Sequence, residues 1–150
     1  MKTFKSQSLD ETLTIASKWL INISNIYNET DEALIVGLSG HLGAGKTAFV
    51  KCIAKELGIQ DDITSPTFVL MKMYDVATST KWPWRRLVHI DAYRLERRED
   101  LIALNWEQLV ANKYNLILIE WPEQVGLNEF EKSAHIQFEI KDGAYTIVFV

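Results

Sequence analysis

Residues 40–47 constrain the fold of this chain more than any other part of its sequence. They run Gly-His-Leu-Gly-Ala-Gly-Lys-Thr and match the phosphate-binding pattern G-x-x-x-x-G-K-[ST] at every fixed position. The apolar run at 33–38 before them predicts a buried strand, and residues 48–57 after them predict a helix. A strand, a glycine-rich loop and a helix in this order predict an α/β fold that binds phosphate at the start of the helix.

The residue types of this loop suit a nucleoside triphosphate. Gly40, Gly43 and Gly45 lack a Cβ atom, so the backbone can adopt positive φ and direct several N–H groups at one phosphate. Lys46 is expected to reach the β and γ phosphates, and the Thr47 hydroxyl is expected to ligate Mg²⁺. The alternative is a glycine-rich turn whose lysine is merely solvated. The strand and helix on either side favour the phosphate site.

Two acidic residues at the ends of apolar runs are candidate partners of the loop. Glu120 follows Leu-Ile-Leu-Ile at 116–119, and Asp91 follows Leu-Val-His-Ile at 87–90. In open α/β sheets, ligands bind at the carboxyl ends of the strands, so both carboxylates are expected near the phosphate loop. A carboxylate in this place would hold Mg²⁺ or its waters opposite Thr47. Taken alone, Asp91 could instead cap a helix, and Glu120 could be a solvated strand end.

Length, charge and cysteine content narrow the class of protein further. The 150 residues predict one domain, and the net charge of −4 argues against independent binding to a nucleic-acid backbone. The single cysteine, Cys52, excludes a disulfide framework and is expected to be a small buried hydrophobe. No apolar run approaches the length of a membrane span, and the first residues lack a signal-peptide core. We therefore expect a cytoplasmic protein without membrane contact.

The remaining pattern predicts helices on both faces of a mixed sheet. Ser8 and Glu11 predict a capping box in front of an amphipathic helix that extends to Tyr27. Further strands are expected at 68–74, 86–91 and 114–120, short helices at 96–104 and 106–112, and a β-hairpin at 135–140 and 144–150. The expected fold is one domain over residues 1–150, a P-loop NTPase-like three-layer α/β/α sandwich. Its mixed sheet would be parallel in the centre and antiparallel at one end, in the C-terminal hairpin.

Four blocks of the sequence carry a family resemblance. They are the loop at 40–47, Thr-Ser-Pro-Thr-Phe at 64–68, His-Ile-Asp-Ala-Tyr-Arg-Leu at 89–95 and Ile-Glu-Trp-Pro-Glu at 119–123. In this order they resemble the TsaE family, formerly called YjeE. The resemblance implies a small bacterial ATPase required to make N6-threonylcarbamoyladenosine at position 37 of tRNAs that read ANN codons. It also implies partners: TsaD, which transfers the threonylcarbamoyl group, its scaffold TsaB, and TsaC, which supplies the activated intermediate in the same pathway. Contact with tRNA would be only indirect, through that complex.

The resemblance also implies roles for single residues, with ATP and Mg²⁺ as cofactors. Lys46 matches the phosphate-binding lysine, and Thr47 and Glu120 match the Mg²⁺ ligands. Asp91 matches an acid that we expect to position or activate the attacking water, which makes Asp91, Lys46 and Glu120 the expected catalytic set. The segment 64–67 is similar to a GTPase switch loop that senses a γ-phosphate. The residues expected to contact ATP are His41, Leu42, Gly43, Ala44, Gly45, Lys46, Thr47, Ala48, Thr64, Ser65, Thr67 and Trp121.

Two loop positions depart from the family pattern. His41 stands where the family usually carries an acid, so one interaction at the mouth of the loop is not carried over. Ala48 stands where a second hydroxyl is common, which removes a group that could lie near the α-phosphate. Neither departure removes the expectation of nucleotide binding.

For three other features, the sequence allows two interpretations each. Trp121 could lie near the nucleotide or a partner surface, or it could pack in the core. Arg94 could contact a phosphate or a partner, or it could pair with Glu99 or Asp100. The patch 81–86, Lys-Trp-Pro-Trp-Arg-Arg, could touch tRNA by stacking and phosphate contacts. Alternatively, it forms a hairpin loop whose tryptophans cover the sheet edge.

The expected activity is hydrolysis of Mg-ATP. The chain offers no obvious arginine finger, so we expect weak activity alone and a site that a partner completes. One alternative is a nucleotide-gated interaction module in which hydrolysis is incidental. Asp91 and Thr67 distinguish the two, because in the module they would affect partner docking and not turnover. Another alternative is a small-molecule kinase, which the short chain without an arginine-rich lid disfavours.

Overall fold

A seven-stranded mixed β-sheet runs through the computed structural model, which describes residues 1–27, 30–127 and 133–150. The strand order across the sheet is β1-β7-β6-β2-β5-β4-β3. The strands are β1 (Lys2–Ser6), β2 (Leu34–Gly40), β3 (Met71–Asp75), β4 (Arg86–Asp91), β5 (Asn115–Glu120), β6 (Ala134–Lys141) and β7 (Ala144–Phe149). The helices are α1 (Leu9–Tyr27), α2 (Lys46–Glu56) and α3 (Trp106–Val110), with the 3₁₀ segments η1 (Arg98–Leu104) and η2 (Pro122–Val125).

The four central strands, β6, β2, β5 and β4, run parallel, as the apolar runs predict. β5 is buried along its whole length, because its alternate side chains enter the cores on opposite faces of the sheet. The sheet is antiparallel at both edges rather than at one, since β1 and β7 extend it beyond β6 and β3 extends it beyond β4. The connection 76–85 between β3 and β4 is too short for the crossover that a parallel pair needs.

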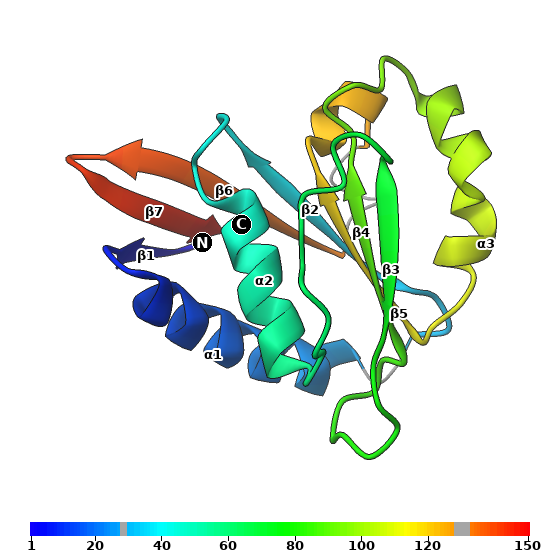
Figure 1. The fold of residues 1–150 in the computed structure, drawn as a ribbon, viewed down its shortest axis with the longest axis horizontal. Helices are drawn as coiled ribbons and strands as arrows, with labels where there is room; N and C mark the ends of the chain where they lie inside the picture. Colours follow the sequence, from blue (N-terminus) through cyan, green and yellow to red (C-terminus); the bar gives the residue numbers. More distant parts are fainter. Residues whose placement is uncertain (28–29, 128–132) are drawn as a thin grey trace.

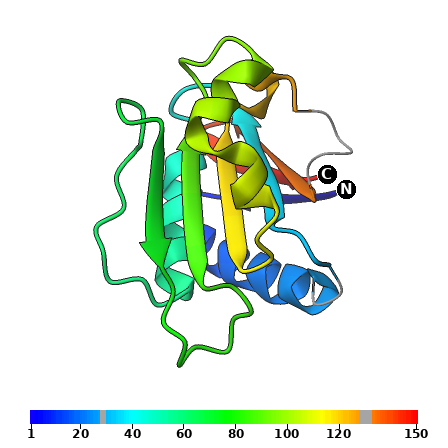
Figure 2. The same ribbon diagram turned by 90° about the vertical axis from the view of Figure 1, so that its right-hand side faces the viewer.

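Helices cover both faces of the sheet, so the expected α/β/α layering is confirmed (Figures 1 and 2). α1 and α2 pack on one face, over Leu34 and Leu38 of β2. On the other face, Trp106 and Leu109 of α3 join the core formed by Val88 and the neighbouring apolar residues of β4 and β5. In Figure 2, α3 lies in front of the sheet, and α1 and α2 lie behind it.

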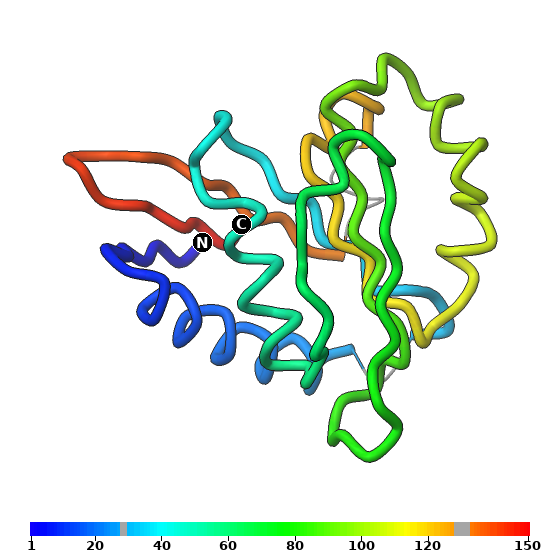
Figure 3. The backbone as a smooth tube through the Cα atoms, in the orientation of Figure 1, coloured from blue at the N-terminus to red at the C-terminus, as the bar shows by residue number. Residues whose placement is uncertain are grey.

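The first strand, β1, is not predicted by the sequence pattern. Its residues are mostly polar, and only Ser6 is buried. β1 pairs antiparallel with β7, so the two ends of the chain lie side by side (Figure 3), and Phe4 packs edge-on against Phe149 with ring centroids 5.5 Å apart. A short edge strand without apolar alternation has no periodic signal, and its pairing partner decides its conformation.

Residues 68–70 form a turn before β3, so the expectation of a strand over 68–74 was wrong at its start. The Pro66 carbonyl accepts the N–H groups of Val69 and Leu70 at 3.1 and 2.6 Å, and Leu70 adopts a left-handed φ of 65°. Phe68 is consequently 84% exposed. A short apolar run has the same composition in a strand and in an exposed turn, so the sequence does not separate them.

The ends of three helical segments follow the sequence predictions to different degrees. Ser8 Oγ accepts the N–H of Glu11 at 3.2 Å, and the Glu11 carboxylate accepts the N–H of Gln7 at 2.7 Å, so the expected cap is present. The helix expected at 96–104 is the 3₁₀ segment η1, which begins at Arg98. The helix expected to reach residue 112 ends at Val110.

Both tryptophans of the patch 81–86 are buried, which removes them from any stacking surface. Trp84 is 0% and Trp82 is 4% exposed, and their rings stack with centroids 6.3 Å apart. Trp82 Nε1 donates to the Glu56 carbonyl at the end of α2, 3.0 Å away. The side chains therefore pack in the core beside α1 and α2, rather than contacting tRNA or covering only the sheet edge.

Cys52 is buried in α2, as expected, and burial raises the pKa of its thiol. Among the helices in the described part of the chain, none combines the length and the apolar character that crossing a bilayer demands.

Candidate nucleotide-binding site

A cavity of about 690 Å³ opens where the parallel strands end, beside the start of α2. Its volume is in the range of small-molecule sites. Residues 42–48 form one wall, and the carboxylates of Asp91 and Glu120 belong to another. β2 is adjacent to β5, and β5 to β4, so all three strands deliver their last residues to the same edge of the sheet. In Figure 3, the loop is the cyan turn between β2 and α2.

The backbone of the phosphate loop requires glycine at both of its ends. Gly45 has φ 105° and is the N-cap residue of α2, so the helix begins directly at the cavity. Gly40 has φ 144°, and a Cβ atom there would lie 2.3 Å from the Phe138 carbonyl oxygen of β6. The loop can therefore turn toward the cavity while β2 and β6 remain closely paired.

Lys46 projects its ammonium group into the centre of the loop. Its Nζ donates to the carbonyls of Gly40 and His41 at 2.5 and 2.9 Å and lies 4.3 Å from the Trp121 ring centroid. The residue is only 4% exposed, and this burial lowers the pKa of Lys46, while Glu120 and two further carboxylates oppose the shift. A buried ammonium at the start of a helix is suited to a phosphate.

Thr47 and Glu120 meet at the mouth of the loop. The Thr47 hydroxyl donates to Glu120 Oε1 at 2.9 Å, and His89 Nε2 lies 2.8 Å from the same oxygen. Hydroxyl and carboxylate oxygens are the donors that Mg²⁺ prefers, and this ion usually binds through one or two protein groups together with substrate phosphates and water. The residues present therefore fit a Mg²⁺ ion whose coordination a nucleotide and water would complete.

Asp91 is connected to the segment 64–67. Its Oδ2 atom accepts the Thr67 hydroxyl at 2.8 Å, and its Oδ1 atom accepts the N–H of Tyr93 at 3.0 Å. Ser65 Oγ lies 2.6 Å from Thr67 Oγ1. The structure thus brings the acid at the end of β4 together with the hydroxyl-bearing segment, across the cavity from the phosphate loop.

Aromatic side chains line the polar end of the cavity. Trp121 adopts a left-handed φ of 58° directly after Glu120, and this turn places its ring beside Lys46 and 5.1 Å from the ring of Tyr93. Trp121 thus lies at the cavity and also packs against a hydrophobic core. Arg94 lies over the exposed Phe68 ring, 4.8 Å from its centroid, whereas Asp100 pairs with Arg97.

Two expected contact residues do not line the cavity. The side chain of His41 is exposed, and its backbone carbonyl binds Lys46. The Thr64 hydroxyl accepts a hydrogen bond from the Lys72 ammonium instead. The loop positions 42–48 and the expected residues Ser65, Thr67 and Trp121 do line it.

Sequence reasoning missed the apolar end of the cavity. Its apolar lining comes from the start of α1 and from the C-terminal hairpin: Leu9, Phe138, Tyr145 and Ile147. The polar residues Gln7, Ser8 and Thr12, before and within α1, line the cavity as well. The pairing of β1 with β7 brings these two ends of the chain together. The local signals there predict a helix cap at Ser8 and a β-hairpin, and neither signal indicates a ligand site. His89 was also missed, although a histidine inside the apolar run of β4 is a visible signal.

The strand, loop and helix unit, the parallel sheet centre and the cavity together define an α/β protein of the P-loop NTPase-like fold. The family model described as threonylcarbamoyl adenosine biosynthesis protein TsaE matches residues 6–146. The chain belongs to the TsaE family.

Individual proteins support the same assignment. The tRNA threonylcarbamoyladenosine biosynthesis protein TsaE of Treponema pallidum is 41% identical over 95 residues, which are 63% of this chain and 64% of that protein. The protein of the same name from a Nostoc species is 37% identical over 109 residues, 70% of this chain and 63% of that protein. The matched regions therefore span less than two thirds of these relatives' own length. The crystal structure of Bacillus subtilis YdiB has a similar fold, with a TM-score of 0.66 at 24% identity, over 99% of this chain and 83% of that one.

Proposed function

We propose that this protein is a Mg-dependent ATPase that acts in the cytoplasm in the synthesis of N6-threonylcarbamoyladenosine at position 37 of tRNAs reading ANN codons. The single observation that carries the proposal is the contact of Thr47 with Glu120, 2.9 Å apart, beside the buried ammonium of Lys46. These groups are the parts that ATP hydrolysis requires of a phosphate loop. Membership in the TsaE family supports the tRNA pathway as the setting.

Each residue of the site has a role in this proposal. The N–H groups at the start of α2 and the Lys46 ammonium stabilise charge on the β and γ phosphates. Thr47 and Glu120 would hold Mg²⁺, which neutralises phosphate charge when it is bound. Asp91 would orient the attacking water through Oδ2, the atom that accepts the Thr67 hydroxyl in this structure. The apolar end of the cavity, with Tyr145 beside it, would receive the base of ATP.

The proposed partners are TsaD and TsaB, with TsaC in the same pathway and tRNA reached only through the complex. The segment 64–70 supports a switch role, because Thr67 is bonded to the site and the neighbouring Phe68 is exposed. A change at the γ-phosphate would thus alter a surface that a partner can contact. The ATP state would favour docking, and hydrolysis would reset it.

The test is steady-state phosphate release from ATP, first by the purified chain and then with TsaB, TsaD and tRNA added. We expect slow release alone and marked stimulation by the partners, and we expect Lys46→Ala to abolish both. Brisk release that ignores the partners, or that only a small metabolite stimulates, would exclude the tRNA-modification ATPase in favour of an independent ATPase or a kinase.

A second candidate function is the nucleotide-gated interaction module, which the exposed Phe68 ring next to the site favours. The variants Asp91→Asn and Thr67→Val separate it from the ATPase. Loss of stimulated phosphate release in both variants supports the ATPase. Unchanged phosphate release with impaired docking on TsaB and TsaD supports the module. Thr14→Val is the matched control, because Thr14 is exposed on α1 and belongs neither to the cavity lining nor to the segment 64–70.

A further inference from the structure

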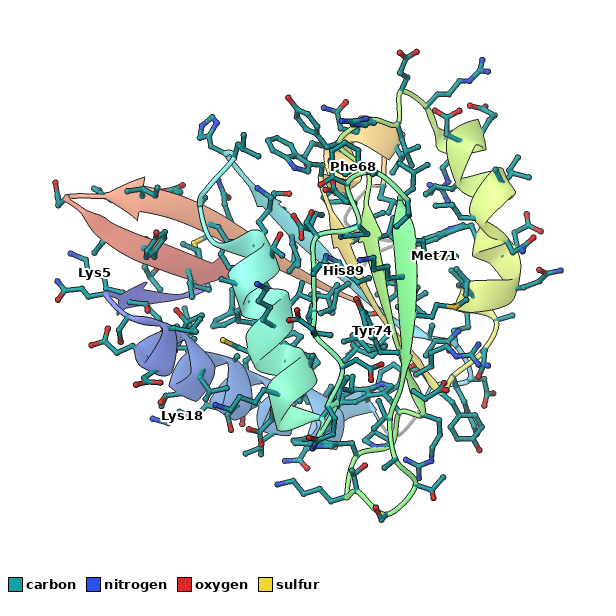
Figure 4. The ribbon with its side chains drawn as sticks, in the orientation of Figure 1. Lys5, Lys18, Phe68, Met71, Tyr74 and His89 are labelled. Atoms are coloured by element: carbon teal, nitrogen blue, oxygen red, sulfur yellow. The ribbon has the colours of Figure 1, made fainter. Side chains whose placement is uncertain are left out.

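His89 is a fully buried polar residue in a position that the strand pattern reserves for an apolar side chain. It is 0% exposed and lies within β4, between Val88 and Ile90, which face the core on the α3 side. Side chains alternate along a strand, so His89 faces the α2 side together with Leu87. Figure 4 labels His89 on this strand, with Phe68 farther along toward the strand ends. An imidazole in this place requires a partner.

The partner of His89 is the proposed metal ligand. β4 and β5 pair in parallel with Asp91 opposite Glu120 and His89 opposite Leu118, so His89 is the diagonal neighbour of Glu120 on the same face. His89 Nε2 lies 2.8 Å from Glu120 Oε1, the oxygen that also accepts the Thr47 hydroxyl. The Glu120 carboxylate is thus held from two sides, by the first turn of α2 and by the middle of β4.

The other ring nitrogen defines the direction of the hydrogen bond. His89 Nδ1 is buried and has no hydrogen-bond partner among the residues of the described ranges. An ionised carboxylate only accepts hydrogen bonds, so Nε2 carries the proton and donates it to Glu120. A proton on Nδ1 would be a buried donor without an acceptor, which is more costly than an unused lone pair. The Nε2–H group of His89 therefore donates to Glu120 Oε1.

We infer that His89 is a positioning residue, which fixes the rotation of the Glu120 carboxylate toward Thr47 and thereby sets the affinity of the site for a divalent cation. This inference rests on the proposed function, in which Thr47 and Glu120 hold Mg²⁺. Residues that hydrogen-bond a metal ligand orient it and raise its basicity, and their loss typically weakens metal binding about 10- to 100-fold. A role in packing alone would need no donor at this position.

The test compares His89→Met with His89→Gln, two side chains of similar length of which only Gln carries an N–H donor. The measurement is the binding of Mn²⁺, a paramagnetic stand-in for Mg²⁺, to the protein with a nonhydrolysable ATP analogue, followed by electron paramagnetic resonance. His89→Met should weaken Mn²⁺ binding by about tenfold or more, and His89→Gln should remain within about threefold of the wild type. Binding of the analogue without metal should be equal in all three proteins, and thermal unfolding in EDTA checks that each variant folds.

The outcomes separate this inference from the proposed function. If His89→Met binds Mn²⁺ as tightly as the wild type while Glu120→Gln binds it more weakly, the role of His89 is overturned. The proposal that Thr47 and Glu120 hold the metal then remains supported. Equal weakening in His89→Met and His89→Gln also overturns the role of His89, because the donor is then irrelevant. Unchanged Mn²⁺ affinity in Glu120→Gln overturns the proposed metal pair, and the inference with it.

A measurement on the unaltered protein covers the case in which His89→Met fails to fold. The chain has three histidines, so its ring ¹H–¹⁵N signals can be assigned by single variants of His41 and His135. Adding Mg²⁺ to the complex with the ATP analogue should shift the His89 ring signals more than those of His135. An unmoved His89 signal overturns the inference.

Discussion

At the scale of single residues, Lys46 shows how the loop keeps a charge in a buried place. Its ammonium is 4% exposed, yet two carbonyls, an aromatic face and nearby carboxylates compensate for the loss of water. A triphosphate would supply stronger acceptors at the same place. We therefore expect the charge of Lys46 to serve phosphate binding rather than stability.

Replacing Lys46 by Ala should remove tight ATP binding. Because a charge-assisted contact to two phosphates is lost, we expect affinity to fall about 100-fold, or about 2.7 kcal/mol, measured by isothermal titration calorimetry. Lys51→Ala is the control, since Lys51 lies exposed on α2. Equal affinity of Lys46→Ala and the control would exclude this loop as the nucleotide site.

Replacing Glu120 by Gln should separate binding from turnover. The variant keeps the size and an acceptor oxygen but removes the charge expected to hold Mg²⁺, so turnover should fall about 100-fold while ATP affinity changes less than about tenfold. Phosphate release and calorimetry measure the two quantities. A parallel loss of both would contradict the metal role and indicate a general contribution to binding.

At the scale of elements, the close pairing of β2 and β6 positions the phosphate loop. Gly40 is opposite Phe138, and the approach of their backbones leaves no room for a Cβ atom. The loop therefore depends on a strand that is distant in sequence. The residues that connect β2 to α2 are consecutive in the sequence, but the path of their backbone depends on the contact with β6.

Gly40→Ala should destabilise the protein through this strand pair. A Cβ atom 2.3 Å from a backbone oxygen, added to an unfavourable φ, should cost about 2 kcal/mol or more, measured by urea unfolding. Gly143→Ala is the matched control, because Gly143 also has a positive φ of 75° but a Cβ atom would meet nothing within 4 Å. The control should lose about 1 kcal/mol. Equal losses would show that backbone strain, and not the contact with β6, dominates.

At the scale of the whole molecule, the cavity joins segments from both ends of the chain. The phosphate loop and the acids form its polar end, while the start of α1 and the C-terminal hairpin form its apolar end. β1 forms the edge of the sheet beside β7, and Tyr145 and Ile147 of β7 line this end of the cavity. A nucleotide in this cavity would thus contact segments that are distant in the sequence and that only the assembled sheet brings together.

Binding of Mg-ATP should therefore protect distant segments together. Hydrogen–deuterium exchange should slow at 42–48 and also at 7–12 and 145–147, because a ligand stabilises every part of the structure that it contacts. Residues 106–110 in α3, on the opposite face, serve as the internal control. Protection confined to the phosphate loop would exclude the apolar end as the site of the base.

Local patterns were sufficient for the centre of the fold and the polar half of the site. The loop motif spans eight consecutive positions, and the apolar runs ending in Asp91 and Glu120 identify two parallel strands whose ends meet at the cavity. These features depend on neighbouring residues in the chain and on the alternation of side chains along a strand. For this reason the parallel sheet centre, the α/β/α layers and the expected meeting of Thr47 with Glu120 could all be derived without coordinates.

Tertiary structure decided the features that depend on contacts between distant segments. The polar β1 becomes a strand only because β7 offers it a partner, and the buried position of Trp84 follows from its packing against Tyr27 rather than from its basic neighbours. The contact of His89 with Glu120 depends on the register between β4 and β5, which no single run of residues records. The sequence by itself thus determined the phosphate loop and its strand, since their physics is local. The pairing of remote backbones and the burial of particular side chains decided the rest of the cavity, because these free energies exist only once the whole sheet has formed.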